Sequence, residues 1–244
     1  MQAKLDLFYP ALDGTDLGFD LYLPESENPP LVVCIHGGGW ISGDRKDYAD
    51  VGIALADHGF AAACPTYRLA PLHPFPTPVD DIRAFVQFAK AESQLGWDPT
   101  RLATLGNSAG GHLAAMAGLL EQEVKAVVDI CGISDVTDPR AQHFPISWAF
   151  LEQFMQIPYE GHDETFRAAS PLHQVPVSPP PFLLIHGEQD DIVPVAQSTS
   201  LANELKRKGG DVELHLLPHD GHSFSYESWE HITSLFVRFL KERL

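Results

Sequence analysis

Short apolar runs, separated by segments with apolar residues at helical spacing, constrain the fold of this chain more than any other feature of its sequence. Leu31-Val32-Val33-Cys34-Ile35 is one such run, and a run without polar alternation is typical of a strand buried on both faces. Strands that alternate with helices indicate a mostly parallel sheet covered by helices on both faces. Six strands of this kind are predicted, at residues 31–35, 60–64, 101–105, 124–130, 182–185 and 212–217.

The segments around these strands complete the α/β prediction. Residues 4–9 and 17–23 flank the turn-forming pair Asp13-Gly14 and predict an antiparallel hairpin at the start. Thr77 is predicted as the N-cap of a helix, and Asp98-Pro99 as a turn that precedes a strand. Further helices are predicted near 48–58, 109–120 and 195–208, with a last amphipathic helix that carries Tyr226, Trp229, Ile232, Phe236 and Phe239.

The alternation of strands and helices lapses between residues 135 and 180, where the chain is mixed and rich in aromatic residues. Such a stretch is too long for a plain loop, so we expect one or two short helices inserted over the sheet. The sequence therefore predicts a single domain over residues 1–244, with a small cap-like helical insert at about 136–172. This insert follows the strand at 124–130, which is the sixth strand when the two hairpin strands are counted.

The pentapeptide Gly106-Asn107-Ser108-Ala109-Gly110 lies between a predicted strand and an Ala-rich helical segment. A G-x-S-x-G sequence at such a junction forces a sharp, strained turn that holds the serine above the sheet, and the glycines spare the collisions that a Cβ would cause. A serine hydroxyl is a weak nucleophile until a base removes its proton, and that base needs an orienting carboxylate. Ser108 is therefore a candidate nucleophile that requires a histidine and an acid beside it.

Candidates for the base and the acid follow the last two predicted strands. His222 lies between the last strand and the last helix beside a glycine, and it is favoured over His219, which has no flanking glycine. Asp190 follows the penultimate strand, and its neighbour Asp191 stays an alternative because adjacent loop side chains point in different directions. Asp135 is a third candidate. The order Ser, Asp, His along the chain is that of α/β-hydrolases.

Three consecutive glycines follow directly after the first buried strand, in His36-Gly37-Gly38-Gly39-Trp40. They let backbone N–H groups converge where a developing oxyanion would lie, and the N–H of Ala109 adds another donor. The glycines are not followed by the Lys-Ser/Thr pair of a phosphate loop, and the sequence contains neither HExxH nor a paired-cysteine motif. We therefore predict no metal and no cofactor.

Charge and cysteine content narrow the classes of partner and the location. The chain has 16 Lys and Arg against 33 Asp and Glu, a net charge of −17, which repels nucleic acids and anionic membranes. The N-terminal residues lack the apolar core of a signal peptide, and no window approaches the roughly 18 apolar residues of a membrane span. We expect a cytoplasmic protein with three buried thiols, those of Cys34, Cys64 and Cys131.

With these pieces in order, the chain resembles the α/β-hydrolase superfamily. Within it, the chain is similar to the small esterases related to hormone-sensitive lipase and to the acetyl/feruloyl esterase and arylformamidase-like groups. The resemblance covers almost the whole chain. It is carried by His36-Gly37-Gly38-Gly39-Trp40, the segment 67–81, the elbow at residues 106–111 and Gly221-His222.

The resemblance also implies roles for single residues. It assigns the oxyanion hole to Gly38, Gly39 and Ala109. The segment from His186-Gly187 to Val193-Pro194 is similar to the prolyl-oligopeptidase-like branch, whose acid is the fifth residue of that motif, and this implies Asp190 as the acid. One departure is Asn107, which stands where the hormone-sensitive lipase group usually has Asp.

These observations lead to the hypothesis of a serine carboxylesterase that cleaves small, uncharged acyl esters through an acyl-enzyme on Ser108. His222 would act as base and then as acid, and Asp190 would orient it. A small-molecule ester is the expected partner, and the oligomeric state, monomer or homodimer, stays open. Several large side chains have two interpretations: they line a pocket for an acyl or aryl group, or they form a satellite core. These side chains are Trp40, Trp148, Phe150, Phe154 and Met155.

Two alternatives use the same residues. An amide hydrolase of the arylformamidase-like or acyl-peptide type would have the same triad and a different substrate. A non-catalytic hydrolase scaffold that acts as a ligand receptor would bind a ligand while its serine resists covalent labelling.

Overall fold

The computed structural model describes residues 1–92 and 94–244, and within them it contains an eight-stranded sheet in the order β1-β2-β4-β3-β5-β6-β7-β8. The hairpin of β1 and β2 is antiparallel, as is the pairing of β2 with β4, and the other neighbouring strands are parallel. The mostly parallel α/β prediction is therefore confirmed. The strands are β1 (Gln2–Pro10), β2 (Asp16–Leu23), β3 (Pro30–Ile35), β4 (Ala61–Pro65), β5 (Asp98–Asn107), β6 (Val124–Ile130), β7 (Phe182–Gly187) and β8 (Val212–Leu217).

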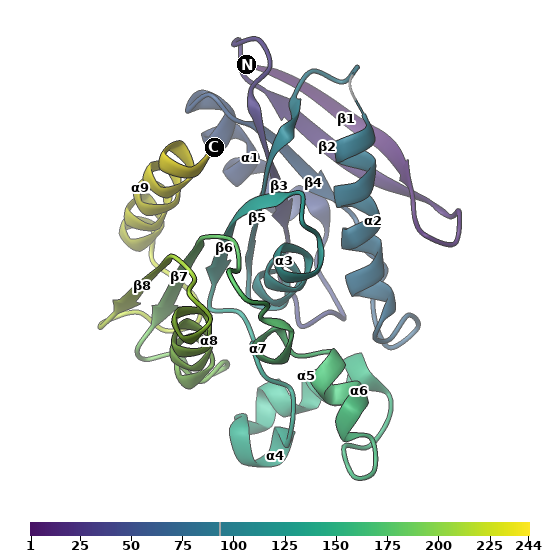
Figure 1. Ribbon diagram of the computed structural model, residues 1–244, viewed down its shortest axis with the longest axis vertical. Helices are drawn as coiled ribbons and strands as arrows, with labels where there is room; N and C mark the ends of the chain where they lie inside the picture. Colours follow the sequence, from purple (N-terminus) through teal and green to yellow (C-terminus); the bar gives the residue numbers. More distant parts are fainter. Residues whose placement is uncertain (93) are drawn as a thin grey trace.

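Helices cover both faces of the sheet (Figure 1). In β3, Leu31 and Val33 pack in one core with α2, α3 and α8, whereas Val32 and Cys34 pack in the other core with α1 and α9. Because successive side chains of a strand point to opposite faces, one continuous apolar run supplies both cores. The helices are the 3₁₀ helix η1 (Arg45–Tyr48), α1 (Ala49–Asp57), α2 (Thr77–Ala91), α3 (Ala109–Leu120), α8 (Ala196–Arg207) and α9 (Tyr226–Arg243).

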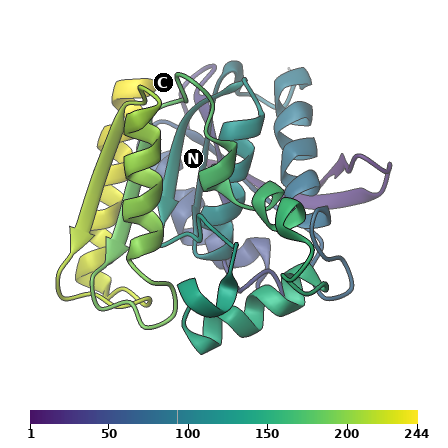
Figure 2. The same ribbon diagram turned by 60° about the horizontal axis from the view of Figure 1, so that its bottom comes forward.

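The segment between β6 and β7 forms an insert at the lower end of the molecule in Figure 1, and Figure 2 brings it forward. In residues 135–180, all of which the structure describes, it holds α4 (Pro139–Gln142), α5 (Pro145–Met155), α6 (Asp163–Ala168) and α7 (Pro171–Gln174). The expectation of one or two helices is therefore wrong. Proline fits the first turn of a helix but cannot continue the preceding one, and a proline opens α4, α5 and α7.

Two local predictions are also wrong. Thr77 is not an N-cap but the first residue of α2, because its N–H already donates to the carbonyl of Pro74 (2.9 Å) and starts the turn earlier. Asp98 belongs to β5, because its N–H donates to the carbonyl of Pro29 (2.9 Å) while its carboxylate accepts the N–H of Thr100 (2.9 Å). The predicted turn thus lies within a strand, where the register of β5 against β3 shifts.

The other predicted strands and helices agree with the structure to within a few residues. Across the described part of the chain, we find no helix that combines the length and the apolar character needed to cross a bilayer.

Candidate active site

Ser108 is the single residue that joins β5 to α3, and its backbone is strained, with φ 54° and ψ −122°. Its N–H donates to the carbonyl of Ile130 (2.8 Å), which holds the turn against the end of β6. A Cβ atom at Gly106 would lie 2.2 Å from the carbonyl oxygen of Gly110, and one at Gly110 would lie 2.1 Å from that of Ile35. Both glycines are therefore required by close backbone approach, as the pentapeptide predicts.

The structure brings Ser108, His222 and Asp190 together in one chain of hydrogen bonds. The Ser108 hydroxyl donates to His222 Nε2 at 3.0 Å, and His222 Nδ1–H donates to Asp190 Oδ2 at 2.7 Å. These residues follow β5, β8 and β7, whose carboxyl ends lie at the same edge of the parallel sheet. The arrangement has the geometry of a nucleophile, a base and an orienting acid.

The alternative acids and the alternative base lie elsewhere. Asp191 and His219 are exposed. The Oδ1 atom of Asp135 accepts the N–H of Thr137 at 2.9 Å, and it lies 3.5 Å from His173 Nε2 in the insert. The hydrogen-bond chain of Ser108 includes none of these three.

Asp190 is held as an ion despite being buried. Burial by itself would raise the pKa of Asp190, but hydrogen bonds from His186 and His222 outweigh burial and hold that pKa well below its usual range. Its Oδ1 atom accepts the backbone N–H groups of Ile192 (2.9 Å) and Val193 (2.7 Å). The carboxylate is therefore ionised at neutral pH, with Oδ2 directed at His222.

The glycine loop after β3 takes up backbone conformations that favour glycine. Gly38 has φ +109° and Gly39 has φ +60°, and a Cβ atom at Gly38 would lie 2.2 Å from the carbonyl oxygen of Ser42. Both line the same cavity as Ser108. Among the described residues, no protein acceptor takes a hydrogen bond from the N–H groups of Gly38, Gly39 or Ala109, so these three donors have no partner in this part of the structure.

Trp40 anchors this loop in the core. Its ring is fully buried and stacks on Phe154 with 4.3 Å between centroids, and its Nε1–H donates to His112 Nδ1 at 3.2 Å. The other ring nitrogen of His112 donates to the carbonyl of Ala169 (2.8 Å). Burial lowers the pKa of His112 to about 4, so the ring stays neutral and can accept from Trp40. The sequence prediction missed this role, although His112 lies one helical turn after Ser108.

The groove around Ser108 and His222 is a cavity of about 420 Å³. It adjoins a second cavity of about 740 Å³, because both are lined by Gly38, Ser42, Asn107 and Trp229. At this junction the Tyr48 hydroxyl donates to Asn107 Oδ1 at 2.8 Å. The groove also has apolar lining residues that the sequence prediction missed, namely Ile192, Phe224 and Trp229.

Of the five predicted pocket residues, Phe150 is the one that lines this groove. Its ring lies over the glycine loop, where a Cβ atom at Gly39 would be 2.8 Å from it. The placement of the others corrects the pocket prediction, because Trp40, Phe154 and Met155 are core residues with 0%, 0% and 3% of their surface exposed.

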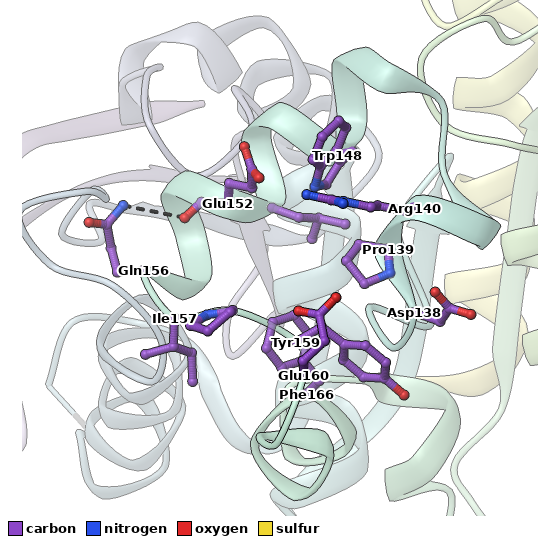
Figure 3. A pocket seen from close by; sticks show the side chains of 12 residues that line it. Asp138, Pro139, Arg140, Trp148, Glu152, Gln156, Ile157, Tyr159, Glu160 and Phe166 are labelled. Carbon is purple, nitrogen blue, oxygen red and sulfur yellow. Dashed lines mark hydrogen bonds between the residues drawn. The ribbon is translucent and has the colours of Figure 1, made fainter.

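Trp148 faces a separate cavity of about 360 Å³ between α4, α5 and α6, which is shown in Figure 3. The guanidinium of Arg140 lies 4.8 Å from the centre of its ring. Residues 148 and 150 point to nearly opposite sides of α5, because two positions along an α-helix are about 200° apart. Neither Ser108 nor His222 lines this insert cavity.

Asp129 in β6 is a buried carboxyl group close to the site. Its Oδ1 atom accepts the N–H of Gly132 at 2.8 Å, whereas Oδ2 has no hydrogen-bond partner in the described part of the chain. Burial raises the pKa of Asp129 to about 6, against opposing effects of His186 and of the Gly132 N–H. The folded protein therefore bears an unfavourable buried charge above that pH.

We expect Asp129→Asn to stabilise the protein at alkaline pH. The folded state keeps the proton of Asp129 between about pH 4 and about pH 6, where the unfolded chain has lost it, so the free energy of unfolding falls over this range as pH rises. Asn cannot ionise, so the variant should gain about 1 to 3 kcal/mol over the wild type near pH 8 and little near pH 4. Urea denaturation of both proteins at the two pH values measures this; an equal difference at both would contradict it.

A family model described as BD-FAE matches residues 19–205. Esterase LipC of Mycobacterium tuberculosis is 34% identical over 214 residues, which cover 80% of this chain and 53% of LipC. Isoprenylcysteine alpha-carbonyl methylesterase ICME of Arabidopsis thaliana is 31% identical over 221 residues, which cover 80% of this chain and 51% of that protein. The chain thus spans about half the length of the curated relatives it matches.

Solved structures are similar over nearly the whole chain. The hyperthermophilic esterase of the archaeon Pyrobaculum calidifontis has a TM-score of 0.87 and 26% identity, covering 99% of this chain and 85% of that one. A bacterial heroin esterase has a TM-score of 0.88 and 26% identity, covering 99% of this chain and 84% of that one. The similarity therefore includes the insert as well as the sheet.

Proposed function

Since this chain belongs to the BD-FAE family and has the α/β-hydrolase fold, we propose that it is a serine carboxylesterase. The observation that carries the proposal is the hydrogen-bond chain from the Ser108 hydroxyl through His222 to Asp190, at 3.0 and 2.7 Å. LipC and the Pyrobaculum protein are themselves named esterases, which supports an ester as the substrate.

In this proposal the reaction begins with proton transfer within the triad. Ser108 Oγ attacks the ester carbonyl carbon while His222 Nε2 accepts the serine proton, and the carboxylate of Asp190 stabilises the imidazolium that forms. His222 then gives this proton to the alcohol oxygen as the ester bond breaks. A water molecule then attacks the carbonyl carbon of the acyl-enzyme while His222 takes a proton from it. His222 returns this proton to Ser108 Oγ as the acid leaves, which restores the hydroxyl.

The negative charge on the carbonyl oxygen requires donors that are already in place. The free N–H groups of Gly38, Gly39 and Ala109 are assigned to this role, since the glycine loop and the start of α3 both adjoin Ser108. Losing one such donor typically costs about 3 to 4 kcal/mol of transition-state stabilisation. The contacts of Trp40 with His112 and Phe154 hold the loop in position for it.

The lining of the groove supports a small, uncharged acyl group. Phe150, Ile192 and Phe224 present apolar surface beside Ser108, and among the described residues that line the groove none is Lys or Arg. A carboxylate on the substrate would find no partner there, and the net charge of −17 would repel it. The adjoining cavity of about 740 Å³ leaves room for a larger group on the other side of the ester.

Matched substrates test the proposal. We expect an aryl acetate to be hydrolysed faster than a formanilide and a peptide anilide that carry the same aryl ring. We also expect acyl esters without charge to be preferred over those with a carboxylate. Turnover of the three substrates by the same preparation is the measurement. Faster cleavage of the formamide would replace the esterase proposal with an arylformamidase-like amide hydrolase.

A further inference from the structure

A second histidine contacts the carboxylate of Asp190. His186, in β7, is fully buried, and its Nε2 atom lies 3.2 Å from Asp190 Oδ2. The same oxygen accepts the Nδ1–H of His222 at 2.7 Å. Asp190 Oδ2 therefore has two histidines beside it. His222 links it to Ser108, whereas His186 is not part of that hydrogen-bond chain.

The partners of His186 determine where its hydrogen lies. Its Nε2 atom also lies 3.0 Å from the carbonyl oxygen of Val193, and because a carbonyl and a carboxylate only accept, Nε2 must carry a hydrogen. Its Nδ1 atom lies 2.7 Å from the hydroxyl of Ser198 in α8, which can donate to it. The ring is thus held at both ends: Nε2–H donates to the carbonyl of Val193 and lies beside Asp190 Oδ2, 3.2 Å away.

The two oxygens of Asp190 have different partners. Oδ1 is held by the backbone N–H groups of Ile192 and Val193, whereas Oδ2 depends on side chains alone. We propose that His186 is a positioning residue that fixes Oδ2 toward His222 and draws off part of its negative charge. The inference rests on the proposed function, to which it adds a residue that acts through Asp190.

This sharing of charge bears on the basicity of the catalytic histidine. A carboxylate with the Nε2–H of His186 beside it stabilises the imidazolium of His222 less than a carboxylate without this neighbour would. A general base works best when its protonation midpoint lies near the operating pH. His186 therefore keeps the base available at lower pH than a triad without it.

Among the described residues, Asp129 and Cys131 are titratable groups that lie near these histidines and Asp190. Asp129 in β6, whose pKa burial raises to about 6, titrates in the same range as a histidine. Cys131 follows β6, and its sulfur lies within 4.8 Å of a carboxylate oxygen of Asp190 and of a ring nitrogen of His222. Burial raises the pKa of this thiol well above its usual value, so the thiol stays neutral. The test is therefore carried out in an Asp129→Asn background.

The experiment measures kcat/KM for a nitrophenyl acetate from about pH 5 to about pH 9. His186→Leu should lower kcat/KM about tenfold and move the acid limb of the profile to higher pH by about half a pH unit. His186→Gln, whose amide N–H can replace Nε2–H, should restore the limb. Ser198→Ala, which touches neither Asp190 nor His222, should give a smaller shift of the same sign, because Nε2–H donates less strongly without a partner at Nδ1.

A matched control removes another buried histidine. Nε2 of His143, in the insert, lies 2.7 Å from the carbonyl oxygen of Asp135. His143→Leu should leave the acid limb of the profile unchanged. A uniform loss of rate without a shift in both His186→Leu and Ser198→Ala would overturn the inference. Titration of the His222 ring followed by NMR separates this proposal from the esterase proposal. In His186→Leu the midpoint of that titration should shift even if no ester is hydrolysed. In that outcome only the esterase proposal fails.

Discussion

Replacing Ser108 with alanine should lower ester turnover by a factor on the order of 10⁵ to 10⁶, because the nucleophile is lost while the fold is kept. Covalent labelling by a serine-directed phosphonate should disappear with it. Turnover on a nitrophenyl acetate and the mass of the labelled protein are the measurements. Labelling or turnover that survives the substitution would refute the role of Ser108, and a wild type that binds ligands but resists labelling would favour the receptor alternative.

A second substitution at the same position separates chemistry from stability. Ser108 adopts φ 54° and ψ −122°, a conformation that costs about 1 to 3 kcal/mol for a residue with a Cβ atom and little for glycine. Ser108→Gly should therefore be as inactive as Ser108→Ala but unfold at a higher urea concentration. The pair serves as its own control, since loss of activity through unfolding would leave the more stable Ser108→Gly variant more active than Ser108→Ala.

Asp190→Asn should lower kcat/KM by about four orders of magnitude. Oδ1 of Asp190 accepts two backbone N–H groups, so the Asn carbonyl will occupy that side and its NH₂ group will face His222 Nδ1. His222 would then accept at Nδ1 and carry its hydrogen on Nε2, where it cannot take the proton of Ser108. The loss should be catalytic, with the folded protein retained.

The neighbouring residue provides the matched control for this change. Asp191 has the same charge but is exposed, so Asp191→Asn should retain kcat/KM to within about twofold, in line with the small effects of surface substitutions. Steady-state kinetics and a urea unfolding curve for both variants complete the measurement. If Asp191→Asn is instead the damaging change, Asp190 is not the acid.

The contact of Ser108, Asp190 and His222 could be predicted because it depends on topology more than on packing detail. Ser108 directly follows β5, Asp190 and His222 lie in the loops after β7 and β8, and parallel strands bring their carboxyl ends to one edge of the sheet. The elbow is equally local, since Gly106 and Gly110 are required by backbone atoms within 2.2 Å of where a Cβ would lie. The catalytic roles of these residues are proposals that the substitutions above test.

The groove could not be predicted in the same way, because the direction of a side chain depends on how its helix packs. Trp148 and Phe150 are two residues apart in an apolar stretch, yet Trp148 faces the insert cavity and Phe150 faces Ser108. The prolines that divide the insert were visible in the sequence, but the orientation of α5 was not. Ile192 and Phe224 reach the groove only because their loops meet there.

By itself the sequence determined the parallel sheet and the strained elbow at Ser108. It also determined which strands are followed by the acid and the histidine that lie beside Ser108. Apolar runs and glycine positions carry this information because they act on neighbouring backbone. The tertiary structure alone decided that His186 lies against Asp190, that His112 accepts from Trp40, and which aromatic rings line the groove. Those roles depend on contacts between residues far apart in the chain, such as Trp40 with His112 and His186 with Ser198, and a buried histidine is recognised by its partners rather than by its neighbours in sequence.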